Sequence, residues 1–254
     1  MAQLIVALDL PRKDAALSLA RDLQGLAPWC KVGMELFTLA GPSLLESLKS
    51  LGFRVFLDLK FYDIPHTVGQ AVKAAAAVGV DLLTLHCQGG ERMCREARAA
   101  VDGLAADSPA RPLLFGVTVL TSFAEGEMPG IAAAPADFAL SLAAGAAAWG
   151  LDGVVCSGLE AARIKTASPG LLCLCPGIRP AGAAAGDQRR VDAVAGDVEK
   201  AHLARRAADG VGHRLTPGEV IAGQIADIDG REFSKSVLHG GHGCGSCSVS
   251  VKNC

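Results

Sequence analysis

The fold of this chain is limited most by a regular alternation between short apolar runs and longer segments whose apolar residues recur at helical spacing. Seven apolar runs follow one another in this way, at residues 4–8, 30–33, 55–57, 81–86, 112–120, 153–156 and 171–175. Short apolar runs of this kind are typical of buried parallel strands. Seven strand-then-helix units with short connections predict an α/β protein with a parallel sheet and right-handed crossovers.

Two architectures fit this order of elements: a closed (β/α)8 TIM barrel and an open, doubly wound sheet. An open sheet that binds a dinucleotide carries a glycine-rich fingerprint after its first strand, but Asp9, Leu10 and Pro11 follow it here. Polar residues end most of the predicted strands, namely Asp9, Lys31, Asp58 with Lys60, His86, Thr121 and Arg179. Because every strand of a barrel delivers residues to one rim, we expect the (β/α)8 barrel.

The composition and charge of the chain limit which partners the protein can bind and where in the cell it is expected. A chain of 254 residues with a net charge of −2 lacks the basic balance of a nucleic-acid binder, and no apolar run is long and charge-free enough to span a membrane. No secretory signal stands at the start, so a cytoplasmic protein is expected. Five of the nine cysteines are predicted to act as small buried hydrophobes, namely Cys30, Cys87, Cys156, Cys173 and Cys175.

Three charged residues follow directly on the third apolar run. Asp58 and Lys60 are two apart, which places them on one face of a strand, whereas Asp63 falls on the loop before Pro65. One interpretation is a solvated loop with an incidental ion pair. Charges attached to a core strand are unfavourable unless they are paired or used in a site. We therefore favour a functional site at the carboxyl end of this strand.

Lys31 adds a second ammonium group, so that Lys31, Asp58, Lys60 and Asp63 supply two positive and two negative charges. A lysine between carboxylates keeps its proton, which makes it a poor Schiff-base nucleophile but suits it to protonating a carbon that develops negative charge. A fixed carboxylate repels a substrate carboxylate, and loss of CO2 relieves that repulsion. These residues predict a decarboxylase that stabilises and protonates a carbanion.

A phosphate site is predicted after the seventh apolar run, since the last loops of such barrels usually hold this group. Arg179 and Gln188 are its candidate ligands. The hydroxyl of Thr121 fits either a contact to a heterocyclic base or a helix N-cap. His86 is interpreted as a structural hydrogen-bonding residue rather than as a ligand.

With these residues identified, the chain resembles the orotidine 5′-phosphate decarboxylase family. The matching segments occur in family order over roughly the first three quarters of the chain, at 6–9, 31–33, 58–65, 85–86, 117–122, 150–157, 176–180 and 186–188. The Asp-x-Lys-x-x-Asp motif formed by Asp58, Lys60 and Asp63 is moderately specific alone, and the ordered set is highly specific.

The resemblance implies a barrel that works as a homodimer without cofactor or metal and converts orotidine 5′-phosphate to UMP. It implies that Lys60 protonates C6 within a network that includes Lys31 and Asp58, and that Asp63 enters the site of the neighbouring subunit. The other implied ligands are Asp9 and Lys31 for the ribose, Thr67 and Thr121 for the nucleotide site, and Arg179 with Gln188 for the phosphate.

The family pattern breaks after Val191. An atypical insertion at 192–214 precedes a displaced Thr-Pro segment at 215–223, and an eighth strand is predicted over 225–231. The favoured phosphate pair of this unit is Gly230 with Arg231, and Arg214 is the rival arginine.

We expect one barrel domain over 1–233 with an atypical eighth unit, followed by a C-terminal tail over 234–254. The tail contains Gly, Ser and Cys residues and lacks helical periodicity, so a flexible segment is expected. Cys244 and Cys247 have the spacing of a zinc pair, but too few further ligands accompany them to favour a defined site.

Two alternative functions remain at this point. The first is a decarboxylase or aldolase of the same barrel group, which uses Mg²⁺ and acts on a sugar phosphate. Such enzymes have a metal-binding carboxylate at the position of Lys31, and the positive charge of Lys31 repels a cation. A non-catalytic barrel that binds UMP is the other alternative, because the altered C-terminal region could remove turnover.

Overall fold

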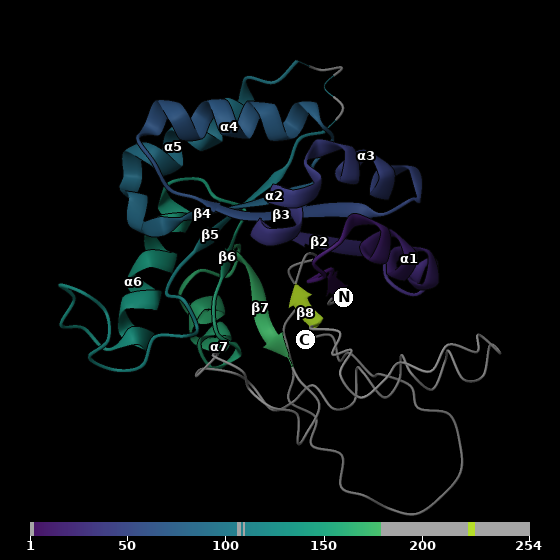
Figure 1. The fold of residues 1–254 in the computed structure, drawn as a ribbon. Helices are drawn as coiled ribbons and strands as arrows, with labels where there is room; N and C mark the ends of the chain where they lie inside the picture. The colour runs from purple at the N-terminus through teal and green to yellow at the C-terminus, as the bar shows by residue number, and fades with distance from the viewer. Residues whose placement is uncertain (1–2, 106–107, 109, 179–222, 227–254) are drawn as a thin grey trace, which may run out of the picture.

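The computed structural model describes residues 3–105, 108, 110–178 and 223–226, and its strands form a closed barrel in chain order (Figure 1). Neighbouring strands from β1 to β7 pair in parallel. The strands are β1 (Gln3–Ala7), β2 (Trp29–Gly33), β3 (Arg54–Phe61), β4 (Leu82–His86), β5 (Leu113–Val117), β6 (Gly153–Val155), β7 (Leu172–Ile178) and β8 (Gly223–Ala226).

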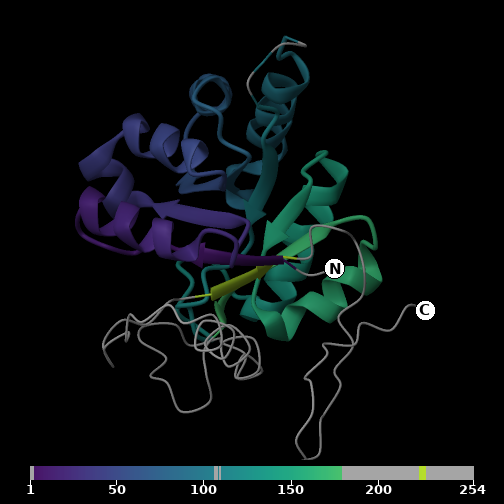
Figure 2. The same cartoon turned by 90° about the vertical axis from the view of Figure 1, so that its right-hand side faces the viewer.

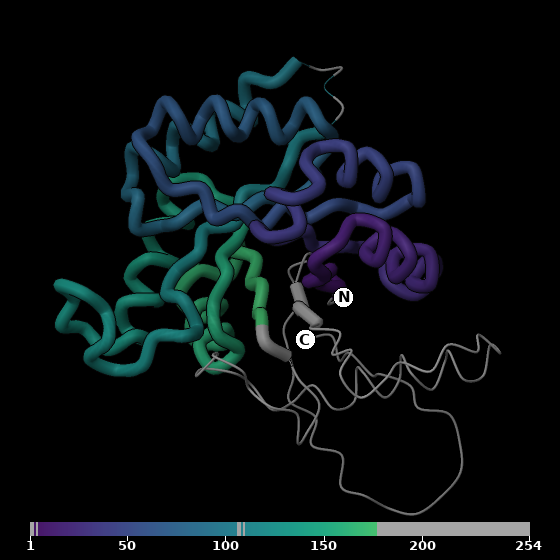
Figure 3. Tube along the Cα trace, viewed as in Figure 1, coloured from purple at the N-terminus to yellow at the C-terminus, as the bar shows by residue number. Residues whose placement is uncertain are grey.

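The described helices lie outside the barrel and cover its strands, as the tube in Figure 3 shows. They are α1 (Lys13–Leu23), α2 (Met34–Ala40), α3 (Pro42–Ser50), α4 (Pro65–Ala77), the short 3-10 helix η1 (Cys87–Gly89), α5 (Gly90–Asp102), α6 (Pro135–Ala148) and α7 (Gly158–Ala167). The predicted (β/α)8 barrel is therefore confirmed; of its eighth unit, the structure describes residues 223–226. None of the helices within the described ranges is long and apolar enough to cross a membrane.

The eighth strand is atypical in its direction. β8 lies between β1 and β7 (Figure 2) and pairs antiparallel with both. Its last residue, Ala226, is the register partner of Gln3, and its first, Gly223, is the partner of Val6. The strand predicted over 225–231 therefore begins two residues earlier, and only its first two residues lie in the described part of the chain.

The seventh strand is longer than predicted. The apolar run that predicts it ends at Cys175, whereas β7 continues through Pro176 and Gly177 to Ile178. The register of β7 against β8 shifts between Cys175 and Ile178. Proline is tolerated at such a bulge because its missing N–H is not needed by the ladder there.

Two apolar layers hold the barrel together. Inside it, large side chains from six strands fill the centre, namely Ile5, Trp29, Phe56, Leu82, Phe115 and Leu174. Between the barrel and the helices lies a larger layer, to which α3 contributes Leu44, Leu45 and Leu48. Four of the five cysteines predicted to be buried are so, and Cys175 is only partly buried. Burial raises the pKa of Cys30 to about 12, so its thiol stays protonated.

The same turn follows α4 and α6. In each, a glycine with positive φ (Gly79 and Gly150) is followed by a buried apolar residue and an aspartate. The N–H groups of Gly79 and Val80 donate to the carbonyls of Ala76 and Ala75, which is the Schellman pattern. The turn after α6 ends in Asp152, whose carboxylate accepts the Leu114 N–H at 2.7 Å.

Replacing Asp152 with Ala is expected to lower the free energy of unfolding by about 1–3 kcal/mol, because the Leu114 N–H loses its acceptor and Arg98 keeps only its ion pair with Asp102. Asp137→Ala removes an exposed ion pair to Arg163 and should change stability by less than about 1 kcal/mol. Urea unfolding of both variants measures the difference. Equal losses would contradict the role of the Asp152 carboxylate in the barrel wall.

Candidate active site

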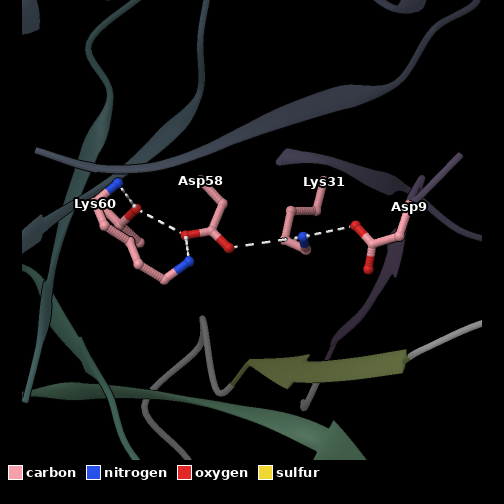
Figure 4. A network of polar contacts seen from close by, with 5 residues as sticks. Asp9, Lys31, Asp58 and Lys60 are labelled. Carbon is pink, nitrogen blue, oxygen red and sulfur yellow. Dashed lines mark hydrogen bonds and ion pairs between the residues drawn. The ribbon is translucent and has the colours of Figure 1, made fainter. Parts of the chain in front are cut away.

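Four charged side chains meet at the carboxyl ends of β1, β2 and β3 and form one continuous chain of contacts (Figure 4). Lys31 Nζ lies 3.1 Å from Asp9 Oδ1 and 3.6 Å from Asp58 Oδ2. The ammonium of Lys60 donates to Asp58 Oδ1 at 3.0 Å. The order of charges is therefore Asp9, Lys31, Asp58 and Lys60, with opposite signs at each contact.

The middle of this network is buried and its ends are more open. The side chains of Lys31 and Asp58 are only 7% and 10% exposed, whereas those of Lys60 and Asp9 are 25% and 59% exposed. Burial of an ion is unfavourable unless an opposite charge and hydrogen bonds compensate it, and each buried group here faces at least one opposite charge. The ends that solvent reaches are where a ligand can make contact.

A bulge in β3 brings Asp58 and Lys60 together. In the pairing with β4, Leu57 matches Leu83 but Phe61 matches Leu85, so three residues of β3 stand opposite one residue of β4. Lys60 has φ = +52° and is the one non-glycine residue with positive φ in the described ranges. Asp58 and Lys60 lie side by side as predicted, but through this bulge rather than through regular strand alternation.

Thr84 is a site residue that sequence reasoning missed. Its hydroxyl, fully buried on β4, donates to Asp58 Oδ1 at 2.9 Å and accepts the Lys60 N–H at 3.0 Å. The available signal was one hydroxyl inside the apolar run Leu-Leu-Thr-Leu, since a buried hydroxyl requires partners.

His86 follows on the same strand, and its ring contacts Tyr62 with centroids 5.6 Å apart. Its Nδ1 is buried without a hydrogen-bond partner among the described residues, so the interpretation of His86 as a structural hydrogen-bonding residue finds no support at this atom. Burial lowers the pKa of His86, the Lys60 ammonium lowers it further, and the Asp58 carboxylate opposes this. His86 therefore adds no third positive charge at neutral pH.

A pocket of about 220 Å³ opens onto the network and is lined by Asp9, Lys31, Gly33, Glu35, Asp58 and Lys60, among others. Gly33 ends β2, and a Cβ there would lie 3.3 Å from Lys31 Nζ. The absence of a side chain at Gly33 thus leaves room for the Lys31 ammonium. Among the residues that the structure describes, no three His, Cys, Asp or Glu side chains are grouped to hold a metal ion.

The remaining predicted site residues lie apart from the network or beyond the described ranges. Asp63 is exposed on the loop after β3, and its Oδ1 accepts the Ile64 N–H at 2.6 Å. Thr67 is exposed on α4, and Thr121 is partly buried in the turn after β5. Arg179, Gln188, Arg214, Gly230 and Arg231 lie outside the described residues, as do the insertion at 192–214, the tail at 234–254 and its Cys244 and Cys247.

The fold and the site define an α/β-barrel enzyme with a network of lysine and aspartate side chains at the carboxyl rim of its strands. The model of the orotidine 5′-phosphate decarboxylase / HUMPS family matches residues 2–203. The chain belongs to this family.

Two bacterial relatives illustrate the similarity. A protein of Nitratidesulfovibrio vulgaris (strain DP4) is 57% identical over 196 residues, which cover 75% of this chain and 82% of the relative. One of Pseudomonas putida (strain W619) is 52% identical over 193 residues, covering 74% and 80%. Both are named orotidine 5′-phosphate decarboxylase.

Solved structures give the same fold. The crystal structure of orotidine 5′-phosphate decarboxylase from Lactobacillus acidophilus is similar, with a TM-score of 0.63 and 37% identity over 71% of this chain and 83% of that one. The enzyme from Methanocaldococcus jannaschii, complexed with the inhibitor BMP, has a TM-score of 0.59 over 75% and 85% of the two chains. At 23% identity, that second structure supports the fold alone.

Proposed function

We propose that this chain decarboxylates orotidine 5′-phosphate to UMP, a step of pyrimidine biosynthesis. The observation that carries the proposal is the unbroken contact chain from Asp9 through Lys31 and Asp58 to Lys60, which lines the pocket at the barrel rim. The family and the names of relatives up to 57% identical support the same substrate.

The charges account for the chemistry as follows. The substrate carboxylate is bound beside Asp58, and the repulsion between the two anions is relieved when the bond from C6 to the carboxylate breaks and CO2 leaves. The electron pair stays on C6, where the Lys60 ammonium stabilises it and then donates its proton. Lys60 regains a proton from solvent, so the balance is one substrate and one proton converted into UMP and CO2.

Lys31 and Asp9 form the other half of the network, and we assign them to the ribose hydroxyls. We assign Thr67 and Thr121 to the nucleotide site and Arg179, Gln188, Gly230 and Arg231 to the phosphate. Binding energy from the phosphate, which is remote from C6, lowers the free energy of the transition state for decarboxylation only if the enzyme binds the phosphate and the reacting pyrimidine at the same time. No cofactor is required by these steps.

We further propose a homodimer in which Asp63 enters the partner's site. Asp63 is exposed and its Oδ1 accepts the N–H of the next residue, Ile64, and its neighbours Tyr62 and Ile64 are 59% and 66% exposed. Exposed large apolar residues beside a charged loop suit a surface that a second subunit covers. A cytoplasmic location is part of the proposal and agrees with six described cysteines, none of them in a disulfide.

The chain is expected to release CO2 from orotidine 5′-phosphate at the same rate with and without EDTA. A divalent cation in the pocket would face the ammonium groups of Lys31 and Lys60, which makes the Mg²⁺-dependent sugar-phosphate alternative unfavourable. Turnover that requires Mg²⁺ would favour that alternative. UMP binding without turnover would identify a non-catalytic binding barrel.

A further inference from the structure

We infer that Thr84 is a positioning residue: it holds the Lys60 backbone in its left-handed conformation and so fixes the Lys60 ammonium beside Asp58. The inference rests on the proposed function, in which Lys60 delivers the proton to the substrate. Thr84 lies on β4, opposite the bulge of β3, and its side chain is fully buried. It acts through Lys60 and Asp58, whose positions it connects.

Three hydrogen bonds among Thr84, Asp58 and Lys60 close a ring. The Lys60 N–H donates to Thr84 Oγ1 at 3.0 Å, and the Thr84 hydroxyl donates to Asp58 Oδ1 at 2.9 Å. The same Asp58 oxygen accepts from Lys60 Nζ at 3.0 Å. One hydroxyl therefore links the main chain of Lys60 to the carboxylate that its own ammonium contacts.

The Lys60 backbone requires such a support. An L-residue with φ near +52° is in a region that its Cβ disfavours, and such a conformation persists only where the surroundings fix it. The bulge interrupts the ladder between β3 and β4, and the Lys60 N–H donates to a side chain where a regular strand would offer a carbonyl. Without the Thr84 hydroxyl, that partly buried N–H and the Asp58 oxygen would each lose a partner.

A pair of isosteric substitutions tests this role. Thr84→Val removes the hydroxyl and keeps the volume, and Thr118→Val does the same just after the neighbouring strand β5, where a buried hydroxyl donates to the Val155 carbonyl at 2.9 Å. Thr84→Val is expected to lower kcat about 10- to 100-fold with KM nearly unchanged, because the proton donor is misplaced while the ligand contacts remain. Thr118→Val is expected to keep the wild-type kcat, and Thr84→Ser to restore most of it.

A second readout is independent of turnover. Hydrogen exchange at the Lys60 amide should become faster in Thr84→Val and stay unchanged in Thr84→Ser and Thr118→Val, since only the first removes its acceptor. If the wild-type chain released no CO2, the proposed function would fail, and this measurement would still decide whether Thr84 holds the Lys60 backbone.

Three results would overturn the inference: the same kcat in Thr84→Val and Thr118→Val, an equal loss in Thr84→Ser and Thr84→Val, or unchanged exchange at the Lys60 amide. If Thr84→Val does not fold, Thr84→Ala and Thr84→Ser replace it. These two differ only in the hydroxyl, and a kcat that is at least 10-fold higher in Thr84→Ser supports the role. Equal kcat values in the two variants overturn it.

Discussion

Lys60→Ala is expected to reduce CO2 release from orotidine 5′-phosphate by about 10⁴-fold or more, because it removes both the proton donor and the ammonium that stabilises the carbanion. Lys60 Nζ contacts Asp58 at 3.0 Å, so the variant also leaves that carboxylate with one opposite charge fewer. UMP carries no carboxylate at C6, and its affinity should change far less than turnover. Steady-state kinetics and calorimetric titration with UMP measure the two effects separately.

Lys49→Ala is the matched control for this variant. Lys49 also pairs with an aspartate, Asp81, at 2.7 Å, but this pair lies where β4 begins, outside the pocket. Lys49→Ala should therefore keep wild-type turnover. Turnover of Lys60→Ala within about tenfold of wild type would exclude Lys60 as the proton donor.

Mixed dimers of Lys60→Ala and Asp63→Ala subunits are expected to regain activity that neither variant has alone. If Asp63 serves the partner's site, one of the two sites in each mixed dimer combines an intact Lys60 with an intact Asp63. Random exchange would then restore about a quarter of the wild-type sites, since about half of the dimers are mixed. The measurement is CO2 release after the two variants are unfolded together and refolded, compared with each refolded alone.

Lys60→Ala mixed with Asp58→Ala provides the control for this experiment. These two residues contact each other within one chain, so no arrangement of subunits rebuilds an intact pair. That mixture should remain inactive. Recovery in both mixtures, or in neither, would contradict a site shared between subunits through Asp63.

Most of the barrel was predictable from the sequence because seven of its strands are apolar runs bounded by helices. The network was predictable in part, since polar residues at strand ends share one rim and Asp58 and Lys60 are two residues apart. The bulge between Leu57 and Phe61 was not, because it depends on the pairing of β3 with β4 and leaves no local mark. The hydroxyl of Thr84 inside an apolar run was a local signal that it needs partners, but which partners it has depends on the same pairing of β3 with β4.

The direction of β8 was also beyond sequence reasoning. Its four residues, Gly223–Ala226, have no long apolar run, and the periodicity of a strand is the same whichever way the chain runs. A strand that runs in either direction can pair with the free backbone N–H and C=O groups of β1 and β7, so a parallel and an antiparallel eighth strand can each close the barrel.

The packed centre of the barrel also determines the route by which substrate and products reach and leave the site. Trp29, Phe56 and Phe115 are at most 1% exposed and fill the axis together with leucine and isoleucine side chains, which leaves no passage along the described part of the interior. Nucleotide and CO2 must therefore both pass through the pocket at the carboxyl ends of the strands, because the packed axis closes the route to the opposite end of the barrel. If a second subunit supplies Asp63, that subunit would lie beside the same opening and border the path of both substrate and product.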